Sequence, residues 1–268
     1  MHGRRMSTNT HGGTRSATLI IAAVCLLGGC AGAHAADAPL VLEHLTTADG
    51  LPQGTVFATL QDSQGFVWLA TEDGLVRYDG HELFRYAYSR SSRDGLPGNY
   101  IRTIVEDGHH DLWIAIKDGG LARWQRATDS FTVYRHDPNN AGSLASDAVH
   151  AVVVDGANRV WVGTTNAGID ILEPSSGRIE HLRHDPNDPS SLIDDRIFTL
   201  ALDRSGALWV GTEVGLDRWQ PEHRAFIHFR HEGGNPRSLS GNQVSRLLED
   251  HSGALWVGTF DEIGRAHV

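Results

Sequence analysis

The chain has 268 residues, of which 40% are hydrophobic and 30 are glycine, so it can bury a substantial core. Its formal net charge is −10, which argues against a nucleic-acid binder, because such a protein needs a basic face. The two cysteines, Cys25 and Cys30, both lie in an N-terminal apolar segment, so the rest of the chain offers neither a disulfide nor a thiolate metal ligand.

The first 35 residues have the pattern of an export signal. Arginines precede a 13-residue apolar run, Ala17 to Gly29, which is shorter than a membrane span of about 20 residues but typical of a signal peptide. Two cleavage sites stay open. The small-x-small sequence at 33–35 would release a chain that begins at Ala36, whereas residues 27–30 resemble a lipobox and would leave Cys30 lipidated. An uncleaved anchor is a third alternative, and all three export the following domain.

A repeat of about 47 residues runs through the rest of the chain. Its most regular position is a tryptophan, with spacings of 45, 48, 48 and 47 residues: Trp68, Trp113, Trp161, Trp209 and Trp256. An aspartate stands six residues before each tryptophan: Asp62, Asp107, Asp155, Asp203 and Asp250. A β-branched residue stands six residues before each aspartate. Three positions in fixed register over five copies indicate internal repeats.

Each repeat predicts four short strands in chain order. The first is apolar and rich in β-branched residues, as in 197–202. The aspartate then opens a tight turn, because its carboxylate can accept hydrogen bonds from amides two or three residues on. Glycine, histidine or asparagine follows three residues later, and these types tolerate positive φ. The second strand carries the tryptophan and is apolar on both faces, a glycine turn leads to the third, and the fourth alternates apolar and polar residues as an edge strand does.

Four short antiparallel strands in a repeat of this length are typical of one propeller blade. A helical solenoid is excluded because no repeat has a helical period of about 3.6 residues, and a β-helix would need a much shorter repeat. We therefore predict an all-β fold, a β-propeller of four-stranded antiparallel blades over residues 36–261.

The repeat also resembles a known family. Residues 203–219, DRSGALWVGTEVGLDRW, resemble the two-component regulator propeller repeat, D-x-x-G-x-L-W-[IV]-G-T-x-x-G-L-x-R-[YW], and residues 62–78 and 250–259 are similar to it. The second copy departs at His110 and at 115–116, and the third departs at 170–172. The resemblance covers residues 41 to about 260. It implies an extracytoplasmic sensor region of a hybrid histidine kinase or a propeller-linked diguanylate cyclase.

The resemblance also sets an expected extent. Propellers of this family usually have seven blades, so we expect four full blades and a partial fifth that ends after its second strand, truncated from a seven-bladed ring. Residues 41–45 would supply the closing outer strand. Residues 262–268 break the repeat pattern and match a reading frame of a common sequencing adapter, so we interpret them as an artefact, with a natural terminus as the alternative. A β-sandwich, a transmembrane helix and an output domain would follow, and these missing parts could form a homodimer.

No Walker loop, dinucleotide fingerprint, zinc-protease motif or nucleophile elbow occurs in the sequence. We therefore expect no catalytic residue, no cofactor and no metal in this chain. Histidines recur before acidic residues at 136, 184 and 231, and we interpret them as turn-forming linkers, because equivalent positions on different blades point apart. The blade tryptophans are interpreted as core rather than as sugar-stacking platforms.

Binding residues are expected in the loops before the first strands, because these loops vary while the framework repeats. In a propeller they gather at one mouth of the central channel. The candidate ligand-binding residues are Asn99, Asp147, Asp194, Arg196 and Asn242. The function expected is sensing of an unknown small molecule or saccharide by the periplasmic part of an inner-membrane receptor. The alternatives are a propeller enzyme acting on polysaccharides, for which only 147 and 194–196 offer a charged cluster, and a non-catalytic interaction scaffold in the envelope.

Overall fold

The computed structural model describes residues 44–89, 95–260 and 262–267. The signal segment predicted at 1–35 lies outside these residues. Of the closing strand predicted at 41–45, only His44 and Leu45 are described, and neither is in a strand. A short 3-10 helix, η1 (Thr47–Asp49), follows and is capped by the Thr46 side chain. Among the described residues, no helix is both long and apolar enough to cross a membrane.

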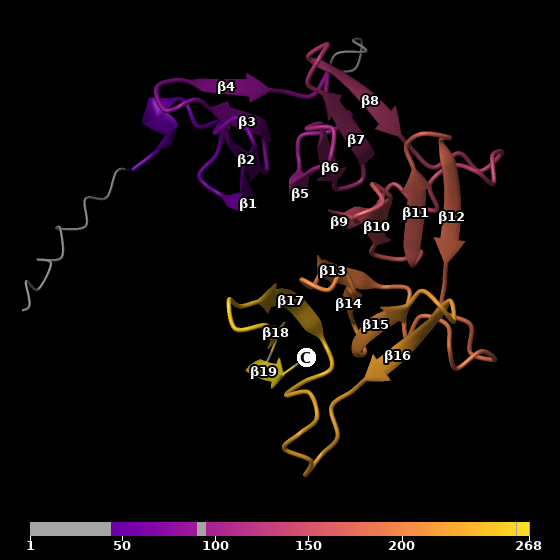
Figure 1. Cartoon of the computed structure of the whole chain (residues 1–268). Coiled ribbons are helices and arrows are strands. Elements are labelled where there is room, and N and C mark those ends of the chain that lie inside the picture. Colours follow the sequence, from indigo (N-terminus) through magenta and orange to yellow (C-terminus); the bar gives the residue numbers. More distant parts are fainter. Residues whose placement is uncertain (1–43, 90–94, 261, 268) are drawn as a thin grey trace, which may run out of the picture. The chain divides into compact units, whose positions relative to one another are not determined.

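The described residues form five antiparallel sheets, each with its strands side by side in chain order (Figure 1). The strands, sheet by sheet, are β1 (Val56–Gln61), β2 (Val67–Thr71), β3 (Gly74–Tyr78) and β4 (Leu83–Tyr86); β5 (Ile101–Glu106), β6 (Leu112–Ile116), β7 (Gly120–Gln125) and β8 (Ser130–Tyr134); β9 (Val149–Val154), β10 (Val160–Thr164), β11 (Ile169–Glu173) and β12 (Arg178–Leu182); β13 (Ile197–Leu202), β14 (Leu208–Thr212), β15 (Leu216–Gln220) and β16 (Ala225–Phe229); β17 (Val244–Glu249), β18 (Ala254–Thr259) and β19 (Ile263–His267). The first strands of successive sheets, β1, β5, β9, β13 and β17, pack against one another. The sheets are therefore the blades of a β-propeller.

The expected blade number is wrong. The structure has five blades around the channel, not four blades and a fifth that ends after its second strand, cut from a seven-bladed ring. The fifth sheet contains a third strand, β19, which pairs along β18 from Gly258↔Ile263 to Ala254↔His267. The side chains of 262–268 depart from the repeat, but a strand pairs through its backbone, and this departure therefore did not stop the sheet from extending. The pairing does not test whether residues 262–268 come from a sequencing adapter.

The conserved spacing of aspartate and tryptophan has a direct structural cause. In every blade the aspartate Oδ2 accepts a hydrogen bond from the indole Nε1 six residues later, at 2.8 or 2.9 Å. Its Oδ1 accepts from amides two and four residues on, as Asp203 does from Ser205 and Ala207. The sequence predicted that the aspartate carboxylate accepts from amides two or three residues later, whereas the second donor is four residues later. His110 and Asn158 have φ of 67° and 60°, so the turn adopts positive φ even where glycine is absent.

The hydrophobic core lies between blades. Trp68 of the first blade packs with Ile104 and Leu112 of the second, and the same arrangement recurs at each later junction. Trp68, Trp113, Trp161 and Trp209 are at most 5% exposed. Trp256, in the fifth blade, is 37% exposed. The first four tryptophans are therefore each covered by the blade that follows. No later blade lies among the described residues to cover Trp256.

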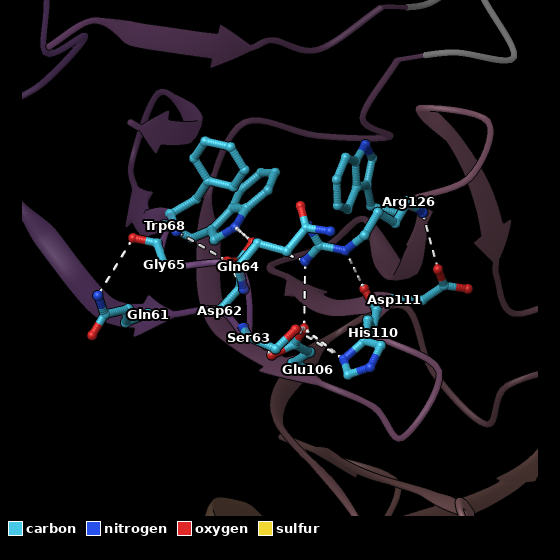
Figure 2. Close-up of polar contacts among 12 residues, drawn as sticks. Gln61, Asp62, Ser63, Gln64, Gly65, Trp68, Glu106, His110, Asp111 and Arg126 are labelled. Atoms are coloured by element: carbon cyan, nitrogen blue, oxygen red, sulfur yellow. Dashed lines mark hydrogen bonds and ion pairs between the residues drawn. The ribbon is translucent and has the colours of Figure 1, made fainter. Parts of the chain in front are cut away.

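A polar network joins the first two blades at the end of their sheets (Figure 2). The Arg126 guanidinium, which follows β7, donates to Asp62 Oδ2 at 2.8 Å and to Gln64 Oε1 at 2.9 Å. Burial raises the pKa of Asp62, but hydrogen bonds from Trp68 and Arg126 outweigh this effect and lower the pKa below 3.8. The ion pair thus ties the Asp–Trp turn of one blade to the next.

Candidate functional site

Every first strand has a β-bulge at the same place. Its second residue is skipped in the pairing with the second strand, so that Ile101 pairs with Ile116 and Thr103 pairs with Ala115. The other four first strands show the same shift. A bulge leaves one residue outside the ladder and re-aims its side chain. The skipped residues are Phe57, Arg102, His150, Phe198 and Ser245.

These bulges build a cavity at the centre of the propeller. It has a volume of about 190 Å³ and is lined by first-strand residues of all five blades. Four of the five skipped residues line it, together with the residues that follow the bulges: Ala58, Thr103, Ala151, Thr199 and Arg246. We call this cavity the channel site. Because each blade contributes, its chemistry depends on residues about 47 positions apart in the sequence.

The channel site is cationic in an acidic protein. The chain carries a net charge of −10, yet the lining contains Arg102 and Arg246 and no carboxylate. Burial lowers the pKa of His150 to about 4, and the charges of the two arginines act in the same direction. His150 is therefore neutral at pH 7. A cleft with charges of one sign concentrates their field and attracts ions of the opposite sign.

The lining also contains the Phe57 and Phe198 rings, and Tyr100 packs beside it. Phe57 and Tyr100 stack with ring centroids 4.9 Å apart, and the Arg102 guanidinium lies 4.5 Å from the Tyr100 centroid and 5.2 Å from that of Phe57. Phe198 meets the His150 ring edge to face at 6.2 Å. The Nε atom of Arg102 is buried and has no hydrogen-bond partner among the described residues. The site thus pairs apolar ring faces with an unsatisfied cationic donor.

Three of the predicted ligand-binding residues occupy a linker position. The side-chain oxygens of Asn99, Asp147 and Asn242 each accept a hydrogen bond from the backbone amide eleven residues earlier, at 2.7 to 2.9 Å. Asp195 does the same in the fourth blade. The carbonyls of Asn99, Asp147 and Asp195 also accept from glycine amides of the previous blade, as Asp147 does from Gly120. These side chains therefore hold the linkers between blades.

Asp194 and Arg196 lie on either side of this linker position. Asp194 Oδ1 accepts from the Arg196 amide at 2.6 Å, and Arg196 forms an ion pair with Glu213 at 3.2 Å. Glu213 also accepts from Gln243 of the fifth blade. None of the five predicted residues lines the channel site. The structure therefore does not bring them together in one cavity, and their role in ligand binding stays a prediction.

The recurring histidines also serve the linkers. The ring Nδ1 atoms of His136, His184 and His231 lie 2.6 or 2.7 Å from the carbonyl oxygens of leucines eight residues later. This places them in the linkers between blades, each two residues before a turn. In the part of the chain that the structure describes, no three His, Cys, Asp or Glu side chains gather as a metal site.

The sequence did contain a signal for the channel site. The position after the first β-branched residue of each repeat is Phe, Arg, His, Phe and Ser in turn, whereas the residue before it is always Val or Ile. The sequence predicted that the variable positions lie in the loops before the strands. Side chains of a regular strand point alternately to its two faces, and this pattern gives no reason for one varied residue near the start of the strand. The bulge supplies that reason.

Comparison with known proteins gives consistent matches. The model of the family described as two component regulator propeller matches residues 50–73, 95–118, 143–166, 191–214 and 238–261. Each match spans the linker, the first strand, the Asp turn and the second strand of one blade. A search of the curated proteins finds no match.

Solved structures resemble the chain closely. The extracellular domain of the hybrid two component system BT3049 from B. thetaiotaomicron is 28% identical with a TM-score of 0.73, over 83% of this chain and 30% of that one. The extracellular domain of BT4673 from the same organism is 25% identical with a TM-score of 0.63, over 77% of this chain and 26% of that one. Virginiamycin B lyase from Staphylococcus aureus, 12% identical with a TM-score of 0.55 over 80% of this chain and 70% of that one, shares the fold alone. The chain thus spans less than a third of the two extracellular domains.

Proposed function

Since the chain carries five repeats of the two-component regulator propeller family, we propose that it is a ligand-sensing, extracytoplasmic region of a bacterial signal-transduction receptor. The observation that carries this proposal is the likeness to the BT3049 and BT4673 domains, which are described as extracellular parts of hybrid two component systems. Both likenesses extend over more than three quarters of this chain.

The channel site supports a sensing role. Five equivalent positions carry four kinds of side chain on a repeated scaffold, and variable residues around a rigid cavity are typical of binding sites. The likeness to virginiamycin B lyase concerns the fold only, and the channel lining has no carboxylate for acid or base catalysis. We therefore favour ligand sensing over a polysaccharide-degrading enzyme or an interaction scaffold.

The receptor would continue into an output domain, a histidine kinase or a diguanylate cyclase, and would act as a homodimer through its membrane and output parts. We propose export through residues 1–35, with cleavage before Ala36 or lipidation of Cys30. Mass spectrometry of the protein from a Gram-negative host should find one of these two N-termini in the envelope fraction. Protein in the cytoplasm with an intact Met1 would contradict export.

Sensing is tested by genetics in the bacterium that carries the gene. Deleting the gene should abolish the transcriptional response to at least one extracellular compound, and the intact gene should restore that response. A gene without the codons for 44–260 should not restore it, although the remaining protein still reaches the envelope. If the deletion leaves the responses to a broad panel of nutrients unchanged, the sensing role is wrong.

A further inference from the structure

We propose that the channel site binds a small organic anion, whose carboxylate or phosphate group pairs with Arg102 and Arg246 while its apolar part stacks on the Phe57 and Phe198 rings. This inference rests on the proposed sensing function for its biological meaning, because it names the chemical class of the sensed ligand. Binding itself can be measured on the chain alone.

The charges in the channel need a counter-charge. Arg102 and Arg246 are close enough to His150 to lower its pKa, so both guanidinium groups act on the same small volume. Arg246 Nη1 donates to the Ser245 carbonyl at 2.8 Å, which leaves its other donors for a ligand. The fork of guanidinium donors matches the geometry of carboxylate and phosphate oxygens. An anion in the channel would balance both charges at once.

Arg102 gives the most specific indication. Its Nε–H is buried without an acceptor among the described residues, although buried donors are almost always hydrogen-bonded. The guanidinium plane is held by the Phe57 and Tyr100 rings, which fix its direction but accept no strong hydrogen bond. The Nε–H itself is covered by protein atoms, so an anion in the channel would act on this guanidinium through its charge. The arrangement is that of a preorganised anion-binding arginine.

The two carboxylates that directly follow second strands, at the ends of β2 and β14, already have partners. Glu213 is paired with Arg196 and accepts from Gln243, and Glu72 accepts from Gln53 at 3.2 Å. In the second blade the position that corresponds to Glu72 and Glu213 is occupied by a cation, Lys117, whose Nζ lies 5.1 Å from the Tyr100 ring centroid.

The volume limits the size of the ligand. A cavity of about 190 Å³ is smaller than the roughly 300 to 1,000 Å³ of a site for a drug-sized molecule. The channel therefore accepts either a small anion or only the charged end of a larger one. Neutral His150 lies beside both arginines, where it can donate or accept one hydrogen bond without adding charge.

Isothermal titration calorimetry on the purified chain tests the proposal with three probes. Benzoate carries a carboxylate on a flat ring, benzamide is its neutral counterpart, and inorganic phosphate is an anion without a ring. We expect benzoate to bind, benzamide to bind at least about tenfold more weakly, a difference of ~1.4 kcal/mol, and added salt to weaken benzoate binding. Binding of phosphate but not benzoate would still support the anion site and would assign it to phosphate groups.

Three variants locate the site. Arg102→Met and Arg246→Met should each weaken anion binding about tenfold or more, or ~1.4 kcal/mol. Arg178→Met, which removes a 72% exposed guanidinium on the outer strand β12, should leave binding unchanged. Arg246 is exposed on β17, so its variant folds even if loss of Arg102 disturbs the aromatic stack.

The proposal fails if neither anion binds, if benzamide binds as well as benzoate, or if both channel variants bind like the wild type. Failure of the sensing function is a different result. In that case the channel binds anions in the calorimeter, but Arg246→Met introduced into the receptor gene leaves every transcriptional response intact.

Discussion

Replacing Asp203 by asparagine should isolate the contribution of the bond between aspartate and tryptophan that recurs in every blade. In the wild type, Asp203 Oδ2 accepts from Trp209 Nε1 at 2.9 Å, and Oδ1 accepts from the amides of Ser205 and Ala207 at 2.9 and 3.0 Å. Asparagine can keep one set of bonds only. If its oxygen faces the turn, its NH₂ group faces the indole N–H; if the amide flips, two backbone amides lose their acceptor.

The better orientation therefore loses the indole bond. Trp209 is 5% exposed and Asp203 is 8% exposed, so water cannot replace the acceptor. Loss of one hydrogen bond to a charged group costs ~1.5–3 kcal/mol. The three remaining bonds, from the Ser205 amide and hydroxyl and the Ala207 amide, weaken because their acceptor is no longer charged. We expect Asp203→Asn to lower the free energy of unfolding by about 2–4 kcal/mol.

Urea unfolding followed by circular dichroism measures this loss, and Trp209→Phe supplies the control, because phenylalanine has no N–H to leave unpaired. In the Trp209→Phe background, the cost of Asp203→Asn should fall by about 1–3 kcal/mol, the size of coupling usual for residues in contact. If the two single effects instead add within about 0.5 kcal/mol, the indole bond is not what the spacing of six residues preserves.

Acid provides an independent check on the same carboxylate. Burial raises the pKa of Asp203, but hydrogen bonds from Ser205 and Trp209 outweigh this and lower it below the unfolded value of 3.8. The carboxylate therefore stabilises the fold above that pH, and this stabilisation is lost as the pH falls through the folded pKa. The difference in stability between the wild type and Asp203→Asn should narrow below pH 3.8; a constant difference would contradict the assignment.

Three further changes probe the linkers, the channel and the first junction. Asp147→Ala removes the acceptor of the His136 amide and should lower the free energy of unfolding, measured by thermal melting, by about 1–2 kcal/mol. An unchanged melting midpoint would show that Asp147 does not stabilise the linker and would favour a role in ligand binding. The pKa of His150 is lowered from 6.5 to about 4, so the unfolded state takes up the proton first. The wild type should therefore lose stability relative to His150→Gln as the pH falls from 6.5 to about 4. If the free energies of urea unfolding of the two proteins change in parallel with pH, this prediction is wrong. Arg126→Met leaves Asp62 without its ion pair and should speed hydrogen exchange in β1 and β2, whereas unaltered exchange would show that the pair contributes nothing.

The repeated features of the fold were predictable because they arise within short stretches of chain. The spacing from Asp203 to Trp209 is set by one turn and one bond between these residues, so it recurs with little variation. The positive φ at His110 and Asn158 follows from the same turn, and both residue types tolerate it better than most. Five copies of a local pattern made the propeller visible in the sequence.

The end of the fifth blade was not predictable on this basis. The sequence of β19 keeps an apolar residue and an arginine in the register of a third strand, with Arg265 opposite Trp256 as Arg218 is opposite Trp209. It lacks the turn glycine and the final aromatic residue, and its pairing with β18 runs through backbone groups. The seven-bladed expectation came from the family and not from any residue of this chain. Side-chain patterns therefore indicate where a repeat is regular, but they do not set the limit of a sheet.

The predicted site residues have a structural role that their sequence pattern did not indicate. Asn99 and Asp147 are polar, vary between blades and precede a strand, which is the pattern of a binding loop. The same residue types also accept hydrogen bonds from their own backbone surroundings, and here they do so. Sequence alone does not distinguish these two uses. The bulge that turns Arg102 into the channel depends on pairing between strands, which no single stretch of sequence reports.

The five bulges separate two requirements that usually conflict in a β-sheet: residues must pair and pack to hold the blade together, and residues at a binding site must be free to differ. An ordinary strand residue is fixed by its cross-strand partner and by the core beneath it, so changing it disturbs the blade. The skipped residues have no partner in the ladder between the first and second strands, so a substitution there leaves that strand pairing unchanged. Under the sensing function proposed above, substitutions at these five positions would change which ligand is bound while the strand pairing of the propeller stays the same.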